Sequence, residues 1–370
     1  MTRYKDAGVH NDLKEAASKV LYEAARKTWK NRKGRFGEIY CPMNDFSGLR
    51  GIKAAGLPPG TIISLGFDGV GTKIQLAEGI NRHDTIAYDL FAMVCDDAVV
   101  RGAEPVLIGS ILDVKSLRSP QGKYFMKQLN QLAKGYVNAA RAARVAVING
   151  EIAELGARVN GYGTFNYNWG AAVLWVANEQ RAITGKKIKA GQTIVALREY
   201  GFRSNGLSLV RKILRNTFGA EYHLGEGTRC VEEALTPSTI YCAAVCDMFG
   251  GAFDEPRANV TGVAHITGGG IPEKLGRVLR PSGLGAVLDT VYDPPSIMQE
   301  VQELGDVPMR EAYNTWNMGN GMLIITTTPE EVIACAEQHN LEAKVAGKIE
   351  AKTNIRLKTY TGKWLNFKCA

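Results

Sequence analysis

The sequence of 370 residues has no apolar run long enough to cross a membrane. Its longest apolar stretch is about Ala171–Ala177, whereas a membrane-spanning helix needs roughly 18 or more apolar residues. The first residues also lack the apolar core of a secretory signal. We therefore expect a cytoplasmic protein that does not contact a membrane.

Cysteine and histidine are scarce. The seven cysteines are scattered without a Cys-x-x-Cys pair, and the chain has five histidines, so we expect reduced thiols and no zinc site. The chain also lacks the signatures of a Walker-type phosphate loop, a dinucleotide-binding glycine loop, a zinc protease and a serine hydrolase. These absences exclude several common catalytic classes.

Positive charge is in excess, but it is concentrated at one end of the chain. The net charge is +8, and residues 1–35 hold ten Lys or Arg against four Asp or Glu. Because little excess remains elsewhere, we do not expect a nucleic-acid-binding surface. The basic segment fits either a solvated amphipathic helix over 12–32 or a mobile arm near an anionic ligand.

Apolar periodicity predicts an α+β protein of two domains. Helices over 84–101 and 121–143 alternate with buried strands such as Thr61–Gly66 and Val106–Leu112. A polar, basic, glycine-containing stretch after Asn178 indicates a domain boundary. We divide the chain into a basic N-terminal segment (1–35), an N-terminal domain (36–178) and a C-terminal domain with a mixed sheet and helices (179–370).

A glycine-rich turn, Asp68-Gly-Val-Gly-Thr-Lys73, follows the first of these strands. Its two glycines allow backbone N–H groups to approach a phosphate, Lys73 adds a positive charge and Asp68 can hold Mg²⁺. The alternative is an ordinary hairpin turn, because Asp-Gly is a common turn dipeptide.

The expected helix over 84–101 is apolar on every side, which is typical of a buried helix. It nevertheless contains Asp89, Asp96 and Asp97, and the first two share a face because they are seven residues apart. Buried carboxylates need cations or hydrogen-bond donors. We interpret them as a site for Mg²⁺ and phosphate; the alternative is a buried salt bridge to Lys or Arg.

Three further segments are candidates for binding anions or metal. The segment Thr267-Gly-Gly-Gly270 precedes a helix with Pro272 in its first turn, and Ser204-Asn205-Gly206 opens another helix. Helix N-termini with glycines favour anions, although ordinary capping explains both. Glu151 and Glu154 follow a buried strand as possible metal or acid–base carboxylates, or as part of a solvated loop.

The order of these segments resembles aminoimidazole ribonucleotide synthetase, also called phosphoribosylformylglycinamidine cyclo-ligase, of the PurM-like superfamily. The resemblance runs nearly end to end. It is carried by Tyr4–Val9, Gly34–Gly37, Asp68–Lys73, His83–Ile86 with Asp89, Asp96-Asp97, Gly102–Pro105, Ser204–Gly206 with Leu209–Leu214, Thr236-Pro237 with Ile240-Tyr241, His265–Gly270, and Asn317–Gly319 with Gly321-Met322.

The resemblance implies two PurM-like domains of mixed α and β structure, with the N-terminal sheet forming a barrel in a homodimer. It implies a Mg²⁺-dependent, non-Walker ATP site shared by the domains. The implied reaction of purine biosynthesis converts formylglycinamidine ribonucleotide and ATP into aminoimidazole ribonucleotide, ADP and phosphate. Because residues 1–35 are charged and contain glycine, we expect them to be mobile without nucleotide and to order over the phosphates.

The resemblance also implies roles for individual residues. The implied catalytic residues are Asp68, Lys73, Asp97 and His265. The implied ATP and phosphate contacts are Lys5, Gly34, Gly37, Gly69, Gly71, Thr72, Asn205, Thr267, Gly268 and Gly269. The implied metal ligands are Asp68, Asp89, Asp96, Asp97 and Glu151.

The sequence departs from the family pattern at several of these places. Asp96 stands where the family usually has Asn, and Arg203 stands where it has the His before Ser-Asn-Gly. Further departures are Phe67, Ile152, Thr239 and Asn314. The resemblance therefore supports an ATP-dependent enzyme more strongly than it supports a particular substrate. Two alternatives stay open: another ATP-dependent small-molecule enzyme of the superfamily, and a catalytically silent nucleotide-binding subunit.

Overall fold

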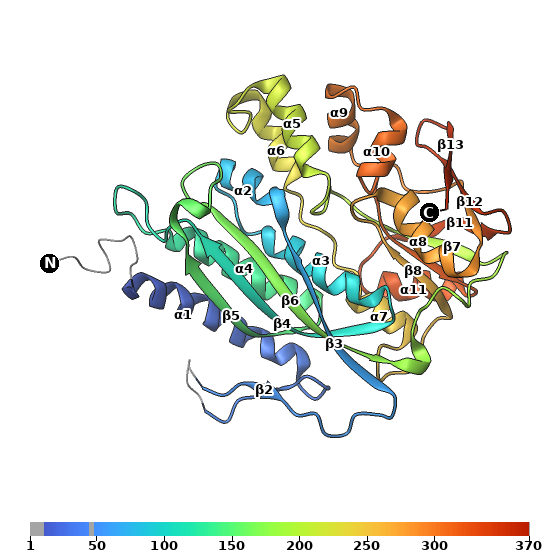
Figure 1. Cartoon of the computed structure of the whole chain (residues 1–370), viewed down its shortest axis with the longest axis horizontal. Coiled ribbons are helices and arrows are strands. Elements are labelled where there is room, and N and C mark those ends of the chain that lie inside the picture. Colours follow the sequence, from blue (N-terminus) through green and yellow to red (C-terminus); the bar gives the residue numbers. More distant parts are fainter. Residues whose placement is uncertain (1–10, 44–47, 370) are drawn as a thin grey trace.

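The computed structural model describes residues 11–43 and 48–369; Lys5, predicted to contact phosphate, lies outside them. The described chain forms two mixed sheets with helices packed against them (Figure 1). The smaller sheet has the strand order β3-β6-β4-β5, and the larger has the order β13-β12-β9-β11-β7-β10-β8. The predicted α+β architecture is confirmed.

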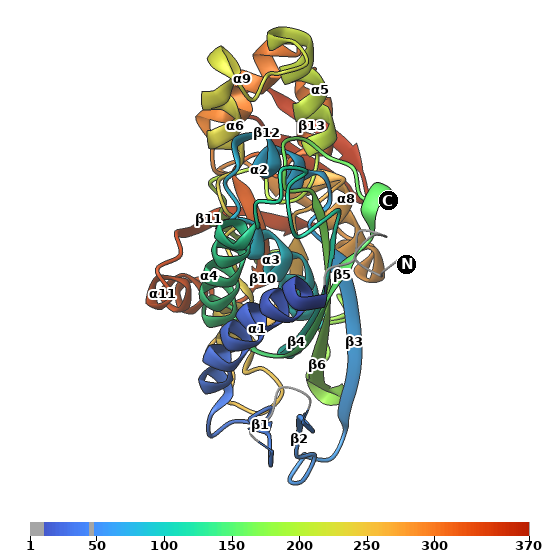
Figure 2. The ribbon, with the colours of Figure 1, turned by 90° about the vertical axis from the view of Figure 1, so that its left-hand side faces the viewer.

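The smaller sheet belongs to the N-terminal half of the chain. Its strands are β3 (Thr61–Gly69), β4 (Ala103–Val114), β5 (Ala146–Glu154) and β6 (Tyr167–Asn178). Strand β6 pairs antiparallel with β3 and β4, and β4 pairs parallel with β5. Figure 2 shows the helices on one side of this sheet. These helices are α1 (Asn11–Thr28), α3 (Ile86–Val99) and α4 (Met126–Ala142). Helix α2 (Ile74–Ile80) lies at one end of the sheet, and the short strand pair β1 (Ile39–Tyr40) and β2 (Gly51–Ile52) lies at the other.

The basic N-terminal segment is part of this packing from residue 11 onward, which differs from the predicted mobile arm. Helix α1 lies against α4 and β5, and its small residues Ala17 and Ala24 are buried. At its end, the Thr28 hydroxyl accepts a hydrogen bond from the backbone N–H of Val147 at 2.8 Å. The indole of Trp29 donates to the carbonyl of the same residue at 2.9 Å. The amphipathic-helix interpretation describes this segment better.

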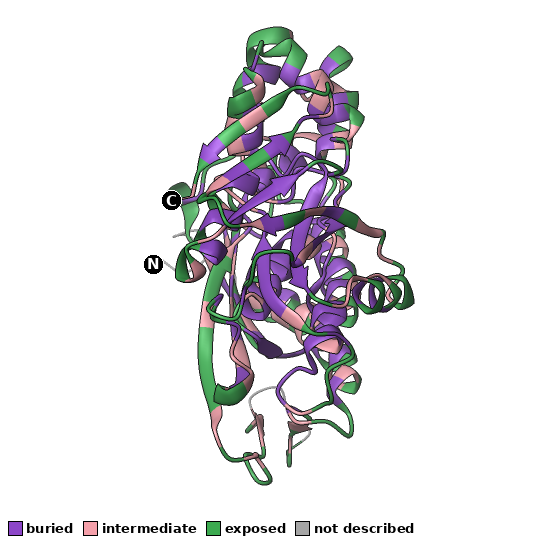
Figure 3. Ribbon diagram, turned by 90° about the vertical axis from the view of Figure 1, so that its right-hand side faces the viewer, coloured by how far each residue is buried: buried purple, intermediate pink, exposed green. Residues whose placement is uncertain are grey.

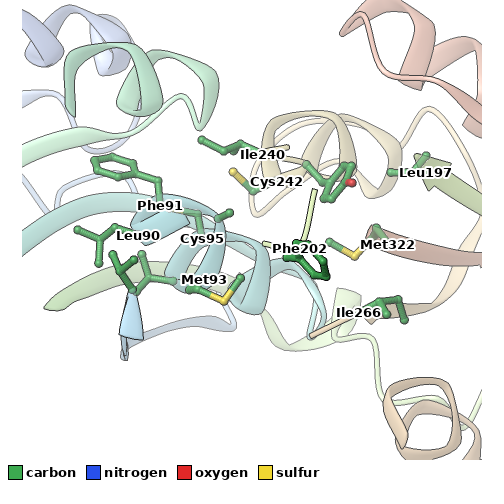
Figure 4. Close-up of a cluster of buried hydrophobic side chains, with 14 of the residues drawn as sticks. Leu90, Phe91, Met93, Cys95, Leu197, Phe202, Ile240, Cys242, Ile266 and Met322 are labelled. Carbon is green, nitrogen blue, oxygen red and sulfur yellow. The ribbon is translucent and has the colours of Figure 1, made fainter. Parts of the chain in front are cut away.

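Helix α3 is the centre of the molecule. It packs against β3, β4 and β6 on one side and against α7 (Cys242–Phe249) and β8 (Val260–His265) on the other. Its apolar side chains, including Phe91 and Met93, belong to one core together with C-terminal residues such as Phe202 and Met322 (Figure 4). The apolar pattern around the whole helix therefore reflects burial on both sides, as predicted.

The larger sheet and the remaining helices form the C-terminal half. Its other strands are β7 (Thr193–Arg198), β9 (Gly285–Leu288), β10 (Asn320–Thr326), β11 (Ala343–Glu350), β12 (Asn354–Lys358) and β13 (Trp364–Lys368). Its other helices are α5 (Leu207–Phe218), α6 (Thr228–Ala234), α8 (Gly270–Leu279), α9 (Ser296–Leu304), α10 (Met309–Thr315) and α11 (Pro329–Gln338). The apolar pattern predicts one closing strand over 354–367, but the chain turns back there and β12 pairs antiparallel with β13.

Strand β3 is an edge strand with exposed apolar side chains. Ile62, Ile63, Leu65 and Phe67 are all exposed, and Phe67 keeps 74% of its surface accessible. Figure 3 shows this strand largely in the colour of exposed residues. An uncovered apolar edge strand is a surface for pairing with another chain.

Over 11–43 and 48–369, no helix has both the length and the apolarity of a membrane span.

Candidate functional site

The end of β3 carries the first group of predicted site residues. The strand extends through Asp68 and Gly69, which pair with Ala171 and Gly170 of β6, so the chain turns later than predicted. Gly71 makes the turn at φ +71, in the left-handed region that favours glycine. A short 3-10 helix and α2 follow. The hairpin alternative is therefore wrong, since a helix follows the turn.

Lys73 and Asp89 form a buried ion pair. The Lys73 Nζ lies 2.8 Å from Asp89 Oδ1, and neither side chain is exposed. The same Nζ donates to the carbonyl of Thr236 at 2.6 Å, and the Ser238 hydroxyl donates to Asp89 at 2.5 Å. Lys73 thus supplies the cation that buried Asp89 requires. This arrangement matches the salt-bridge alternative and leaves no exposed surface of Lys73 for a phosphate.

Asp96 is also paired within the protein. Its Oδ2 lies 2.9 Å from Nη2 of Arg203, and neither side chain is exposed. The Nη1 of Arg203 lies 2.6 Å from Glu199, whose side chain is equally buried. The backbone N–H groups of Tyr241 and Cys242 donate to the other oxygen of Asp96. Asp96 is therefore saturated by protein donors, as the salt-bridge alternative expects.

Asp97 differs from its two neighbours on α3, because its side chain is 59% exposed. Its Oδ1 lies 2.6 Å from Nδ1 of His265, at the end of β8. Partial burial raises the pKa of Asp97, but the hydrogen bond from His265 and the positive charge of Lys274 hold it below its usual value. Asp97 is therefore an anionic carboxylate at the surface of an otherwise buried cluster.

Asp68 lies within electrostatic range of Asp97, His265 and Lys274. Desolvation raises the pKa of Asp68, the N–H of Gly69 opposes this, and the negative charge of Asp97 raises it further. The two carboxylates thus disfavour each other's ionisation, and a bound cation would relieve the repulsion. The structure brings together Asp68, Asp97 and His265 of the predicted catalytic set.

The predicted C-terminal phosphate contacts lie beside this group. The Thr72 hydroxyl is 3.3 Å from the Ser208 hydroxyl, which places the turn after β3 next to the first residues of α5. The Asn205 amide lies close to the backbone of Gly268, which precedes α8, so the N-termini of α5 and α8 are adjacent. Among the described residues, Ser204 Oγ and Asn205 Oδ1 are buried without a hydrogen-bond partner. Thr267 and Gly269 belong to the same turn before α8. Adjacent helix N-termini favour an anion.

Two predicted groups are not part of this assembly. Gly34 and Gly37 line a separate hollow of about 800 Å³ with Glu104 and Asp254. Glu151 lies on β5, three strand positions from Asp68 on β3, which is about 14 Å at the usual strand spacing. It forms an ion pair with Lys14 at 2.8 Å. Asp68 and Glu151 are therefore too far apart to ligate one metal ion together.

The residues of this site fit Mg²⁺ only as two carboxylates whose coordination is completed by substrate phosphates and water. Within the described ranges, no group of three or more His, Cys, Asp or Glu side chains could hold a metal. Mg²⁺ is, however, usually bound by one or two carboxylates together with substrate phosphates and water. Asp68 and Asp97, which repel each other, would supply those carboxylates, whereas Asp89 and Asp96 are already paired.

Sequence reasoning missed several contributors to the site. Glu199, Ser238 and Lys274 were not singled out, and the aspartates near which Ser238 and Lys274 lie are distant from them in the sequence. Arg203 was noticed only as a departure from the family pattern. The available signal was the four-residue spacing of Glu199 and Arg203, and in the structure the two form an ion pair.

The chain matches two family models in the expected order. Residues 52–172 match the AIR synthase related protein, N-terminal domain, and residues 189–359 match the corresponding C-terminal domain. Among curated proteins, the phosphoribosylformylglycinamidine cyclo-ligase of Thermococcus kodakarensis is 31% identical over 97% of this chain and 99% of its own length. That of Acetivibrio thermocellus is 34% identical over 88% of this chain and 89% of its own length.

Solved structures share the fold at low sequence identity. The hydrogenase maturation protein HypE of E. coli has a TM-score of 0.60 at 16% identity, covering 96% of each chain. The thiamine-monophosphate kinase of Stenotrophomonas maltophilia has a TM-score of 0.57 at 12% identity, covering 91% of this chain and 95% of its own. T. maritima PurL complexed with FGAR has a TM-score of 0.54 at 13% identity; this chain spans 53% of it. The relatives that are 31–34% identical over most of the chain, together with the two family models, establish that the chain belongs to the AIR synthase related family.

Proposed function

We propose that this protein is an ATP-dependent cyclo-ligase of the cytoplasm. It would convert formylglycinamidine ribonucleotide and ATP into aminoimidazole ribonucleotide, ADP and phosphate as a homodimer in purine biosynthesis. The observation that carries the proposal is the contact between Asp97 and His265 beside Asp68, next to the adjoining N-termini of α5 and α8. Relatives at 31–34% identity over most of the chain bear the cyclo-ligase name.

The proposed reaction is phosphoryl transfer followed by ring closure. The formyl oxygen attacks the γ-phosphate of ATP, ADP leaves, and the oxygen becomes part of a phosphate leaving group. An amidine nitrogen then attacks the formyl carbon. The five-membered ring closes, and phosphate departs with the former formyl oxygen. Such chemistry depends on positioning and on neutralisation of charge, with no need for a protein nucleophile.

The described residues divide this work between the two domains. The N-termini of α5 and α8 would bind phosphate oxygens through backbone N–H groups, with Asn205 and Gly268 between them. Asp68 and Asp97 would hold Mg²⁺, which neutralises phosphate charge when bound. His265 orients Asp97 by donating a hydrogen bond from Nδ1.

Product analysis by mass spectrometry tests this proposal. The protein is incubated with ATP, Mg²⁺ and formylglycinamidine ribonucleotide, and Asp97→Asn serves as the matched inactive control. We expect aminoimidazole ribonucleotide and ADP in equal amounts. Bound ATP without this product would contradict the proposal.

A second candidate is another ATP-dependent activity on a small molecule. It is favoured by three departures from the family pattern that lie together, because Arg203 donates hydrogen bonds to both Asp96 and the carbonyl of Thr239. Mg²⁺-dependent ATP turnover with a different phosphate acceptor would support this candidate. A catalytically silent subunit would instead bind ATP without turnover.

A further inference from the structure

Arg203 occupies a completely buried position between the two domains. It lies in the loop between β7 and α5 at φ +59, a left-handed conformation that residues other than glycine rarely adopt. Its Nη1 donates to Glu199 at 2.6 Å and to the carbonyl of Thr239 at 2.8 Å. Its Nη2 donates to Asp96 at 2.9 Å and lies 2.7 Å from Nε2 of His265.

The contact between Arg203 and His265 restricts where the imidazole can carry its proton. A guanidinium has only donors and keeps its charge, so Nε2 of His265 must accept. A neutral imidazole with an accepting Nε2 carries its proton on Nδ1. That atom lies 2.6 Å from Oδ1 of Asp97, where it donates. The opposite tautomer would place N–H against N–H on one side and a lone pair against a carboxylate on the other.

We propose that Arg203 is a positioning residue that holds His265 in the Nδ1–H tautomer and thereby orients the carboxylate of Asp97. One oxygen of Asp97 is then engaged by His265, and the other is left for a ligand at the surface. The inference rests on the proposed function, in which Asp97 faces the ATP phosphates.

The arrangement can act as a rigid support because the carboxylates that hold Arg203 are themselves held. Asp96 accepts hydrogen bonds from the backbone N–H groups of Tyr241 and Cys242 at 2.9 and 2.8 Å. Glu199 accepts from the backbone N–H of Tyr200 at 3.0 Å and from the Thr239 hydroxyl at 3.3 Å. Support of this kind fixes the rotamer of a functional group more tightly than packing alone.

The tautomer is measured by ¹⁵N NMR of the histidine rings in the full-length protein without ligand. The His265 signal is identified by its loss in His265→Asn. We expect a protonated Nδ1 and an unprotonated Nε2 in the wild type. Arg203→Lys keeps the charge but replaces two donor nitrogens by one, so we expect a mixture of tautomers. A wild-type proton on Nε2, or an unchanged ring spectrum in Arg203→Lys, overturns the inference.

Arg144→Lys is the matched control. Arg144 also crosses the domains, pairing with Asp247 at 2.7 Å beside His339. Its substitution should leave the His265 spectrum unchanged, and a change equal to that in Arg203→Lys would overturn the inference.

A second pair of variants leaves Arg203 in place and serves if Arg203→Lys fails to fold. His265→Asn retains an amide donor near the Nδ1 position, whereas His265→Gln places its amide near Nε2. We expect Asn to retain about 10- to 100-fold more kcat than Gln at similar KM for ATP, because it still orients Asp97. Equal loss in both would overturn the inference. The NMR result and the product analysis are independent. If the Nδ1–H tautomer depends on Arg203 but the protein makes no aminoimidazole ribonucleotide, the proposed reaction is refuted and the positioning role of Arg203 remains.

Discussion

Asp96 on α3 and Arg203 before α5 join the two domains by an ion pair, with Oδ2 and Nη2 2.9 Å apart and both side chains fully buried. In the sequence these residues are two separate departures from the family pattern, which has Asn and His at these positions. Because they contact each other directly, we expect the two charged residues to be energetically coupled.

The coupling predicts a non-additive double mutant. Asp96→Asn and Arg203→His should each lower the free energy of unfolding by about 3–5 kcal/mol, because each leaves a buried charge without its partner. The double variant should recover about 1–3 kcal/mol of the summed loss. Urea unfolding measures all four proteins. Strict additivity would show that the two positions are independent.

Asp97 and Asp89, both on α3, should respond differently to loss of charge. Asp97→Asn should change the unfolding free energy by less than about 1 kcal/mol, since the side chain is largely exposed. It should lower Mg²⁺-dependent turnover about 100-fold or more. Asp89→Asn should cost about 3–5 kcal/mol, because it leaves Lys73 buried and unpaired. Unfolding and turnover per folded molecule are measured on both. A destabilised Asp97→Asn with normal turnover would remove its proposed role.

The apolar edge strand β3 predicts a homodimer. Leu65 is 53% exposed on this strand, and Leu65→Lys should convert the dimer to a monomer, because a charge would be buried in the interface. Leu224 in the C-terminal half is 57% exposed, and Leu224→Lys is the control that should remain dimeric. Light scattering at micromolar concentration distinguishes the states. A monomeric wild type would refute the prediction.

Asp247 predicts a pH dependence of stability. Burial raises its pKa, but hydrogen bonds from His339 and Arg144 lower it to about 2, from 3.8. An acid with a lowered folded pKa stabilises the protein above its unfolded pKa and loses this effect as pH falls from 3.8 through 2. Asp247→Asn should therefore cost about 2 kcal/mol at pH 7 and progressively less below pH 4. Urea unfolding across this range measures the difference. A constant difference would contradict the assignment.

Local pattern was sufficient to predict several elements and part of the site. The sequence predicts a strand over 193–198 and a helix over 329–338, and β7 and α11 have these bounds, because each has clear periodicity and end signals. The buried character of α3 followed from its apolar residues alone. Short helices such as α10 escaped prediction, since seven residues give too little periodicity.

The partners of the buried carboxylates could not be read from the sequence. Asp96 and Arg203 are 107 residues apart, and Asp89 and Ser238 are 149 apart. Sequence indicates that a buried carboxylate needs a cation or donor, but only the fold decides whether a metal or a side chain provides it. For Asp89 and Asp96 the fold provides Lys73 and Arg203.

The position of α3 at the junction also has a consequence for synthesis on the ribosome. Its Asp96 is made 107 residues before Arg203, the side chain that neutralises it in the folded protein. The N-terminal half therefore emerges with a carboxylate and an apolar helix face whose partners do not yet exist. Domains usually fold in order as they emerge, and here we expect the last contacts of α3 to form only after the second domain has emerged. Nascent chains that end before residue 203 should accordingly be protease-sensitive and depend on chaperones.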